Sequence, residues 1–313
     1  MARDLAVHRS VGVRPLGGVG AGSRTEVVRK YFERTPPPAH KRNAVLVLSL
    51  ACIGVMSAAG MLVTHHSSLA LGTALLTLVP LAQGVRLMAT YRHQYAAAEP
   101  KPTDALMDEL LSADLRRAAD RALQRLGITL DELELRSRDV DPLARGGSRR
   151  LADQGRGAIA VFGPTPHAVG RIGLDRKWRF ATYRIMVICP TGHHLGIYQC
   201  DLDLATGRRY RERTDEYHYD DVVAIRTTTT AAPDLTIGVL DASALHRMWL
   251  RGTLYRQLQI IVSSGDRSSI IVGITDEDER GNNIPLQESG IDAVIEAVRR
   301  TLRTKKGGIV PST

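Results

Sequence analysis

The chain of 313 residues carries a formal net charge of +9, and aromatic residues make up only 4% of it. Nine Lys and Arg but only three Asp and Glu fall within residues 1–42, so the positive excess is concentrated ahead of the first apolar run. This distribution indicates a basic flank beside a membrane and excludes a single-strand nucleic-acid surface, which interleaves cations with aromatic residues. We expect residues 1–42 to be a flexible cytoplasmic arm that attracts anionic lipid and contains a short helix at residues 25–33.

Two uncharged runs dominate the hydropathy pattern. Residues 44–63 and 69–85 contain no Asp, Glu, Lys or Arg, and a polar turn at residues 64–68 separates them. A bilayer-spanning helix needs about 20 mostly apolar residues, which the first run supplies and the second reaches if Arg86 snorkels. The pattern predicts a two-helix transmembrane hairpin over residues 43–90. A signal peptide would have one short apolar core, and a buried soluble hairpin would keep a polar stripe.

Charge also predicts the orientation of this hairpin. Cations flank both of its outer ends, whereas the connecting turn contains no Lys or Arg. The positive-inside rule therefore places both termini in the cytoplasm and only the turn on the outer face of the cell membrane. The residues expected at the membrane interface are Lys41, Arg42, Arg86, Tyr91 and Arg92.

An amphipathic helix is expected beyond a linker at residues 91–102. Thr103 is a favourable N-cap, apolar residues recur at three- and four-residue spacing as far as Leu126, and Gly127 favours a helix end. Such a helix could bind a partner, form one strand of a coiled coil, or pack on the following domain, which is the commonest case. Residues 103–155 are thus predicted to be a helical segment followed by a loop.

From residue 156 onward the apolar period changes from helical to alternating. Predicted strands cover residues 180–189, 195–204, 208–214 and 222–230, with a hairpin at 258–262 and 270–274. An amphipathic helix over residues 291–302 has a basic end, and residues 307–313 form a tail. The predicted fold is a membrane α-helical hairpin plus a cytoplasmic α+β domain over residues 156–306. That domain would be an antiparallel sheet or small barrel closed by the C-terminal amphipathic helix.

Residues 217–225, the hairpin at 260–274 and the helix at 291–302 together resemble the cytoplasmic pleckstrin-homology-like modules of bacterial membrane proteins. The resemblance covers residues 180–306, and the insertion at 231–254 does not fit it. It implies a bent strand barrel plugged by the final helix. It also implies a binding or scaffolding role, because this fold seldom carries out chemistry.

Polar residues around the predicted strands offer weak candidates for a site. These weak candidates are His193, His194, His218, Asp220 and Asp221. No C-x-x-C, H-x-x-x-H or H-E-x-x-H spacing joins them, and no nucleophile-elbow, kinase or dinucleotide-binding motif is present. We therefore predict no catalytic residue, no metal and no cofactor. The three cysteines suit a reducing compartment in which a disulfide between Cys189 and Cys200 is not expected.

Three classes of function remain. The first is an integral membrane protein whose non-catalytic cytoplasmic module binds or scaffolds a protein partner, as an accessory of a membrane assembly. The partner would meet a sheet edge, the helix at 106–126 or the acidic loop at 276–279. The second is a two-span sensor or effector that forms a homo-oligomer through small residues of the hairpin. The third is a membrane-bound enzyme that uses residues between Asp201 and Asp221. We favour the first class.

Overall fold

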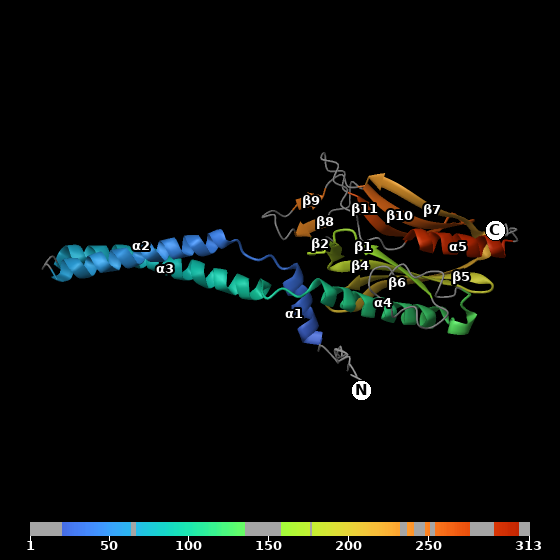
Figure 1. Cartoon of the computed structure of the whole chain (residues 1–313), viewed down its shortest axis with the longest axis horizontal. Coiled ribbons are helices and arrows are strands. Elements are labelled where there is room, and N and C mark those ends of the chain that lie inside the picture. Colours follow the sequence, from blue (N-terminus) through green and yellow to red (C-terminus); the bar gives the residue numbers. More distant parts are fainter. Residues whose placement is uncertain are drawn as a thin grey trace, which may run out of the picture.

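The computed structural model shows a long helical hairpin that projects from a β-rich domain (Figure 1). The structure describes residues 21–63, 67–134, 158–175, 177–231, 237–240, 248–250, 254–275 and 291–306. The described helices are α1 (Ala21–Phe32), α2 (Pro38–Val63), α3 (Ser67–Ala98), α4 (Asp104–Leu126) and α5 (Ile291–Lys305), with short 3₁₀ turns at Leu130–Glu132 and Tyr219–Asp221.

Small residues let α2 and α3 pack closely along their length. Ala44, Ala51 and Ala58 repeat every seventh residue and are buried against α3. A Cβ atom added at Gly54 would lie 2.0 Å from the Thr77 methyl group, and one added at Gly84 would lie 2.8 Å from Leu48. Close backbone approach at small residues is the usual way in which membrane helices associate.

Both hairpin helices are long and apolar enough to cross a membrane, and the qualifying stretches are Pro38–Met61 and Leu71–Ala98. Only 17% and 6% of their most apolar windows are buried, so neither is the covered core helix of a soluble domain. Large apolar side chains are exposed on α2 and α3, including Leu50, Met56 and Leu76. The coarse prediction of a helical hairpin beside an α+β domain is therefore confirmed.

Helix α3 continues well beyond its apolar part. The linker predicted at residues 91–102 is wrong over residues 91–98, which continue the helix, with Tyr91 and Tyr95 stacked at 5.9 Å between ring centroids. At 1.5 Å per residue, the segment from Arg86 to Ala98 is a stalk of about 20 Å. Charge and polarity there stop the apolar run without stopping the helix, because Arg, Gln and Ala are good helix formers.

The described half of the N-terminal arm contains the expected short helix, but this helix is not a free tether. Residues 21–32 are helical, and α1 buries Val28 and Tyr31 in the core of the β-rich domain. The flexible arm predicted over residues 1–42 is thus wrong for this segment, since an exposed tether would leave both side chains in water. Residues 1–20 lie outside the described part of the chain.

The strands of the domain form three hydrogen-bonded sheets. One has the order β1-β4-β5-β6, the second β11-β10-β7 and the third β3-β2-β8-β9. Their bounds are β1 Ile159–Pro164, β2 Val169–Ile172, β3 Trp178–Phe180, β4 Thr182–Pro190, β5 His194–Asp203, β6 Arg208–His218, β7 Val222–Ala231, β8 Ile237–Leu240, β9 Met248–Leu250, β10 Leu254–Val262 and β11 Arg267–Thr275. All pairings are antiparallel except that of β2 with β8. Closure into one barrel is not seen among the described strands.

The first sheet is covered on both faces across β1, β4 and β5, which explains why β4 is almost continuously apolar. Ile185 and Val187 point into the cluster that contains the apolar face of α4. Met186 and Ile188 point into a second cluster with β10, β11 and α5. A strand covered on both sides loses the apolar–polar alternation of a half-exposed strand.

Helix α4 is packed on this sheet, so the commonest of its three predicted roles is confirmed. Thr103 accepts a hydrogen bond from the Leu106 amide at 3.3 Å, and Gly127 ends the helix in the left-handed region at φ 64°. Met107, Leu111 and Leu115 are buried. The apolar face of α4 is therefore not available to a partner.

Glycine packing in the hairpin gives a first testable prediction. Gly54→Val should destabilise the α2–α3 pair by about 1–3 kcal/mol, because the new side chain overlaps Thr77. Gly60→Val is the matched control, since an added Cβ there meets nothing within 4 Å. Both variants make the same change in helix propensity. SDS titration of the full chain in mild detergent should separate them, and equal midpoints would contradict this packing.

Candidate functional site

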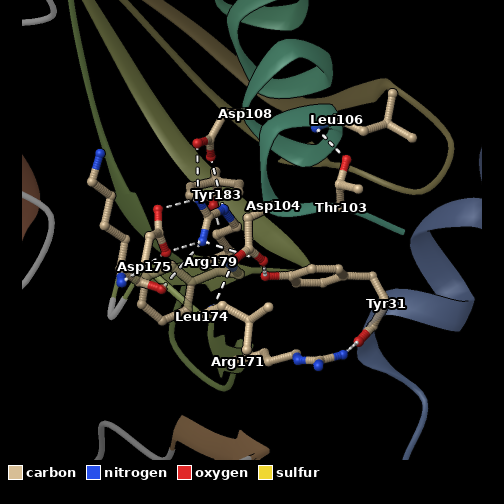
Figure 2. A network of polar contacts seen from close by, with 12 residues as sticks. Tyr31, Thr103, Asp104, Leu106, Asp108, Arg171, Leu174, Asp175, Arg179 and Tyr183 are labelled. Atoms are coloured by element: carbon tan, nitrogen blue, oxygen red, sulfur yellow. Dashed lines mark hydrogen bonds and ion pairs between the residues drawn. The ribbon is translucent and has the colours of Figure 1, made fainter. Parts of the chain in front are cut away.

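A buried guanidinium group lies where the hairpin joins the β-rich domain (Figure 2). The Arg179 side chain, on β3, is only 2% exposed and contacts three carboxylates. It donates in bidentate fashion to Asp108 of α4 and to Asp175, with all four N–O distances 2.8 Å, and lies 3.7 Å from Asp104. We call Arg179 and these three carboxylates the junction. Bidentate arginine pairs fix orientation as well as supply energy.

Helix α1 is attached to the junction through Tyr31. Its hydroxyl donates to Asp104 Oδ1 at 2.7 Å, and the other oxygen of Asp104 accepts the Leu174 amide at 2.7 Å. Arg171 of β2 donates to the Tyr31 carbonyl at 2.6 Å, and its guanidinium lies 4.7 Å from the ring centroid. Burial, then the hydrogen bond to Asp104, raises the pKa of Tyr31, which therefore stays a hydrogen-bond donor. The two helices that flank the hairpin thus share one anchor.

Within the junction, Arg179 stabilises the ionised form of Asp175. Hydrogen bonds from Arg179 lower its pKa from 3.8 to about 2, so it stays ionised in mild acid. A depressed carboxyl pKa stabilises the folded state above the unfolded-chain value and loses this contribution as pH falls through the folded value. The contribution of Asp175 is therefore complete above about pH 4 and disappears towards pH 2.

A second buried ion pair fastens α1 to α4. Asp114 is 0% exposed, and its carboxylate contacts Arg24 and, at 3.0 Å, Arg117. The Arg24 guanidinium also donates to the Leu204 carbonyl from Nε at 3.0 Å and from Nη2 at 2.8 Å. Gly207, at φ 68°, leaves room for it, because a Cβ there would lie 2.9 Å from Arg24 Nη1. One side chain of α1 therefore reaches both α4 and the β5–β6 turn.

The five candidates predicted from the sequence are brought to one end of the domain but are not joined. His194 and His218 are cross-strand partners, and His194 Nε2 lies 3.9 Å from Glu216. The Asp220 carbonyl accepts a hydrogen bond from Lys306 Nζ at 3.5 Å, and the Asp221 carbonyl accepts one from the Ser263 amide at 2.8 Å. His193 donates its amide to Thr191 at 3.4 Å. Within the described residues no group of three His, Cys, Asp or Glu could hold a metal ion.

The cysteines of the domain are free and buried. Cys189 of β4 faces Gly196, and Cys200 of β5 faces Ile185, so the two thiols are not cross-strand partners. Burial raises the pKa of Cys189 to about 12 and that of Cys200 to about 11. The thiolate is the reactive form. Both groups are therefore protected from alkylation in the folded state.

This protection can be measured. In a Cys52→Ser background, the folded chain should take up almost no maleimide at pH 8, and denaturant should expose both thiols. Thr214→Cys, on an exposed face of β6, should react at once and is the positive control. Because the folded pKa values are raised above the usual 9.0, both thiols remain protonated where the unfolded chain ionises. Stability should therefore fall as pH rises from about 9 towards 12. Rapid labelling without denaturant would contradict the burial.

A groove lies between β7 and α5. These two elements are on the opposite side of the domain from α4 (Figure 1). Its volume is about 390 Å³, and it is lined by residues 222–225 of β7 together with Arg299, Leu302, Arg303 and Lys306. Arg299 donates to the Ile225 carbonyl at 3.3 Å, and Lys306 donates to the Val222 carbonyl at 2.6 Å. The groove thus combines an apolar floor with cations that are bonded to backbone oxygens.

Neither the junction nor the groove was predicted as a site. No family model matches the chain, and comparisons with curated proteins and with solved structures gave no match. Function is therefore inferred from geometry alone. The junction joins the hairpin to the domain, and the groove is an open hollow lined by cations and apolar side chains.

Proposed function

We propose that this chain is a two-span integral membrane protein whose β-rich domain is a non-catalytic binding or scaffold module in the cytoplasm. The exposure of large apolar side chains on the hairpin carries the proposal. Water cannot stably cover such a surface, and lipid can. Since α1 and α4 bind the domain through the junction, the hairpin would anchor this domain at the membrane.

The register of the hairpin supports the proposed membrane boundary. Gly54 of α2 lies beside Thr77 of α3, and Leu48 of α2 lies beside Gly84 of α3, so the two helices are antiparallel. Continuing this register brings Lys41 and Arg42 level with Tyr91 and Arg92, where aromatic and basic side chains would meet the headgroups. Arg86 would lie one helical turn deeper and snorkel outward.

The architecture of the domain favours binding over chemistry. Two of the sheets are wholly antiparallel, and α5 packs against them. This arrangement is compatible with a pleckstrin-homology-like module, and we propose that the domain is related to such modules. Of the three partner surfaces considered, the apolar face of α4 is buried and residues 276–279 lie outside the described part of the chain. An open sheet edge is thus the best-supported partner surface.

Flotation and accessibility experiments test the anchoring and orientation. The full chain should float with liposomes after a carbonate wash. In intact cells an impermeant maleimide should label Ser68→Cys but not Arg300→Cys, which lies on the exposed face of α5. Arg300→Cys should react after lysis. Recovery of the chain in the supernatant would refute the anchor, and labelling of Arg300→Cys in intact cells would refute the orientation.

A further inference from the structure

We infer that the open edge of β7, together with the basic face of α5, binds an extended acidic segment of a partner protein as an added strand. This inference rests on the proposed binding role and names the surface and chemistry of the partner. Strand addition uses main-chain hydrogen bonds for affinity and alternate side chains for specificity. The open edge of β7 supplies the main-chain hydrogen-bonding groups. The groove and its cations supply contacts for the side chains of the added strand.

The backbone of β7 has one unused side. The strand pairs with β10 along its length, in regular register between Ile225 and Ala231. Arg299 bonds to the Ile225 carbonyl from the side away from β10, and in an antiparallel strand both peptide groups of a residue point the same way. Thr227 and Thr229 therefore direct their N–H and C=O groups to the open side. No described strand pairs with β7 there.

Over residues 225–231 this edge lacks the devices that normally prevent strand addition, because the irregularity in the pairing of β7 with β10 lies at residues 222–224. The outer strand β6 carries a row of charged residues and a bulge, with Arg211 at a φ of 55°. Charges and bulges of this kind block edge-to-edge pairing. By contrast, β7 carries four consecutive threonines at residues 227–230 and a single charged residue, Arg226. An exposed strand without such protection is a template for another strand.

The groove beside this edge favours an acidic ligand. Arg299, Arg303 and Lys306 line it, and among the described residues no carboxylate lies within ion-pair distance of any of them. Arg299 and Lys306 bond to strand carbonyls instead. Val223, which is 64% exposed, and Leu302 provide apolar contacts between these cations. Alternating acidic and apolar side chains would therefore complement the groove.

A defined peptide tests this inference on the full chain in nanodiscs of zwitterionic lipid. The probe is a fluorescein-labelled peptide of four Glu-Val repeats, and the readout is fluorescence anisotropy. We expect saturable binding that weakens with salt, and no binding of the corresponding Lys-Val peptide. The same probe N-methylated at alternate residues should bind at least about tenfold more weakly, because it cannot pair with a strand. Equal affinity of the methylated probe would overturn strand addition.

Two protein variants locate the binding. Arg303→Glu should weaken binding of the probe at least about tenfold, because a cationic hydrogen-bond donor is replaced by an anion. Thr227→Pro should weaken it similarly by removing one outward N–H, whereas Thr227→Ala keeps that group and should bind normally. Unchanged binding by Arg303→Glu would overturn the assignment to this groove. Since peptide binding and liposome flotation are separate measurements, failure of one leaves the result of the other intact.

The acidic segment of the chain itself is the competing occupant. Residues 276–279 read Asp-Glu-Asp-Glu and precede α5. Neutralising all four to Asn and Gln should change the affinity for the probe by no more than about twofold if the groove serves a partner. A rise of tenfold or more would assign the groove to this segment and overturn the inference.

Discussion

Replacing Arg179 with leucine is expected to destabilise the β-rich domain by about 3–4 kcal/mol, because three carboxylates would lose their shared cation. Asp104, Asp108 and Asp175 approach one another only because the guanidinium lies between them. Each is partly exposed, so water would recover some of the loss. Urea unfolding of the full chain in detergent, followed by the fluorescence of neighbouring Trp178, should report the change.

Two controls make the Arg179 prediction specific. Arg213→Leu removes an exposed ion pair with Asp215 and should cost less than about 1 kcal/mol. Arg179→Lys keeps the charge but loses both bidentate pairs, so it should fall between wild type and the leucine variant. If the leucine variant unfolds at the same urea concentration as Arg213→Leu, the junction does not stabilise the domain.

Replacing Asp114 with alanine should cost about 3 kcal/mol and release α1, because the buried Arg24 would lose its only carboxylate among the described residues. The Leu204 carbonyl would remain as a neutral acceptor and cannot compensate a full charge. Release should free the backbone at Arg29 and Lys30 from the packed helix, so limited trypsin digestion should cut there before it cuts elsewhere in the domain.

Asp120→Ala provides the matched control for Asp114→Ala. Both residues lie on α4, and Asp120 is exposed where Asp114 is buried. The control should unfold within about 0.5 kcal/mol of wild type and keep its resistance to trypsin. Equal protection of α1 in both variants would mean that Val28 and Tyr31 hold the helix without the ion pair.

Local chemistry made the ends of several elements predictable from the sequence. Thr103 and Gly127 bound α4 where expected, and the β10–β11 hairpin turns at Gly265, which has a φ of 87°. Thr129 and Glu132 form a capping box, which starts the short 3₁₀ turn at Leu130–Glu132. Caps and turns depend on neighbouring residues, so the sequence contains the necessary information.

Contacts between distant segments were not predictable in the same way. Asp108 and Arg179 are 71 residues apart, and the segment of α1 predicts an arm because it is poor in large apolar residues. The one local signal was Arg179 itself, placed between the aromatic residues Trp178 and Phe180 in a strand. The short strands β8 and β9 were missed as well, because their pairing with β2 depends on the assembled sheet.

The outer edge of β7 illustrates the limit for the site. Its β-branched run predicted a strand, but no pattern within one strand states which neighbours it will have. Cations at the end of α5 complement the helix dipole, but Arg299 and Lys306 also contact strand carbonyls. The proposed binding surface therefore became visible only when the strand order was known.

The stalk of α3 has an electrostatic consequence for the proposed module. At physiological ionic strength the Debye length is about 8 Å, so the potential of anionic headgroups at the level of Arg92 decays about threefold over the roughly 9 Å of helix from Arg92 to Ala98. Helix α5 lies still farther away, at the end of the domain opposite the hairpin (Figure 1). Its cations would respond to the charge of a bound protein and not to the leaflet, so changing the anionic lipid content should leave peptide affinity unaltered.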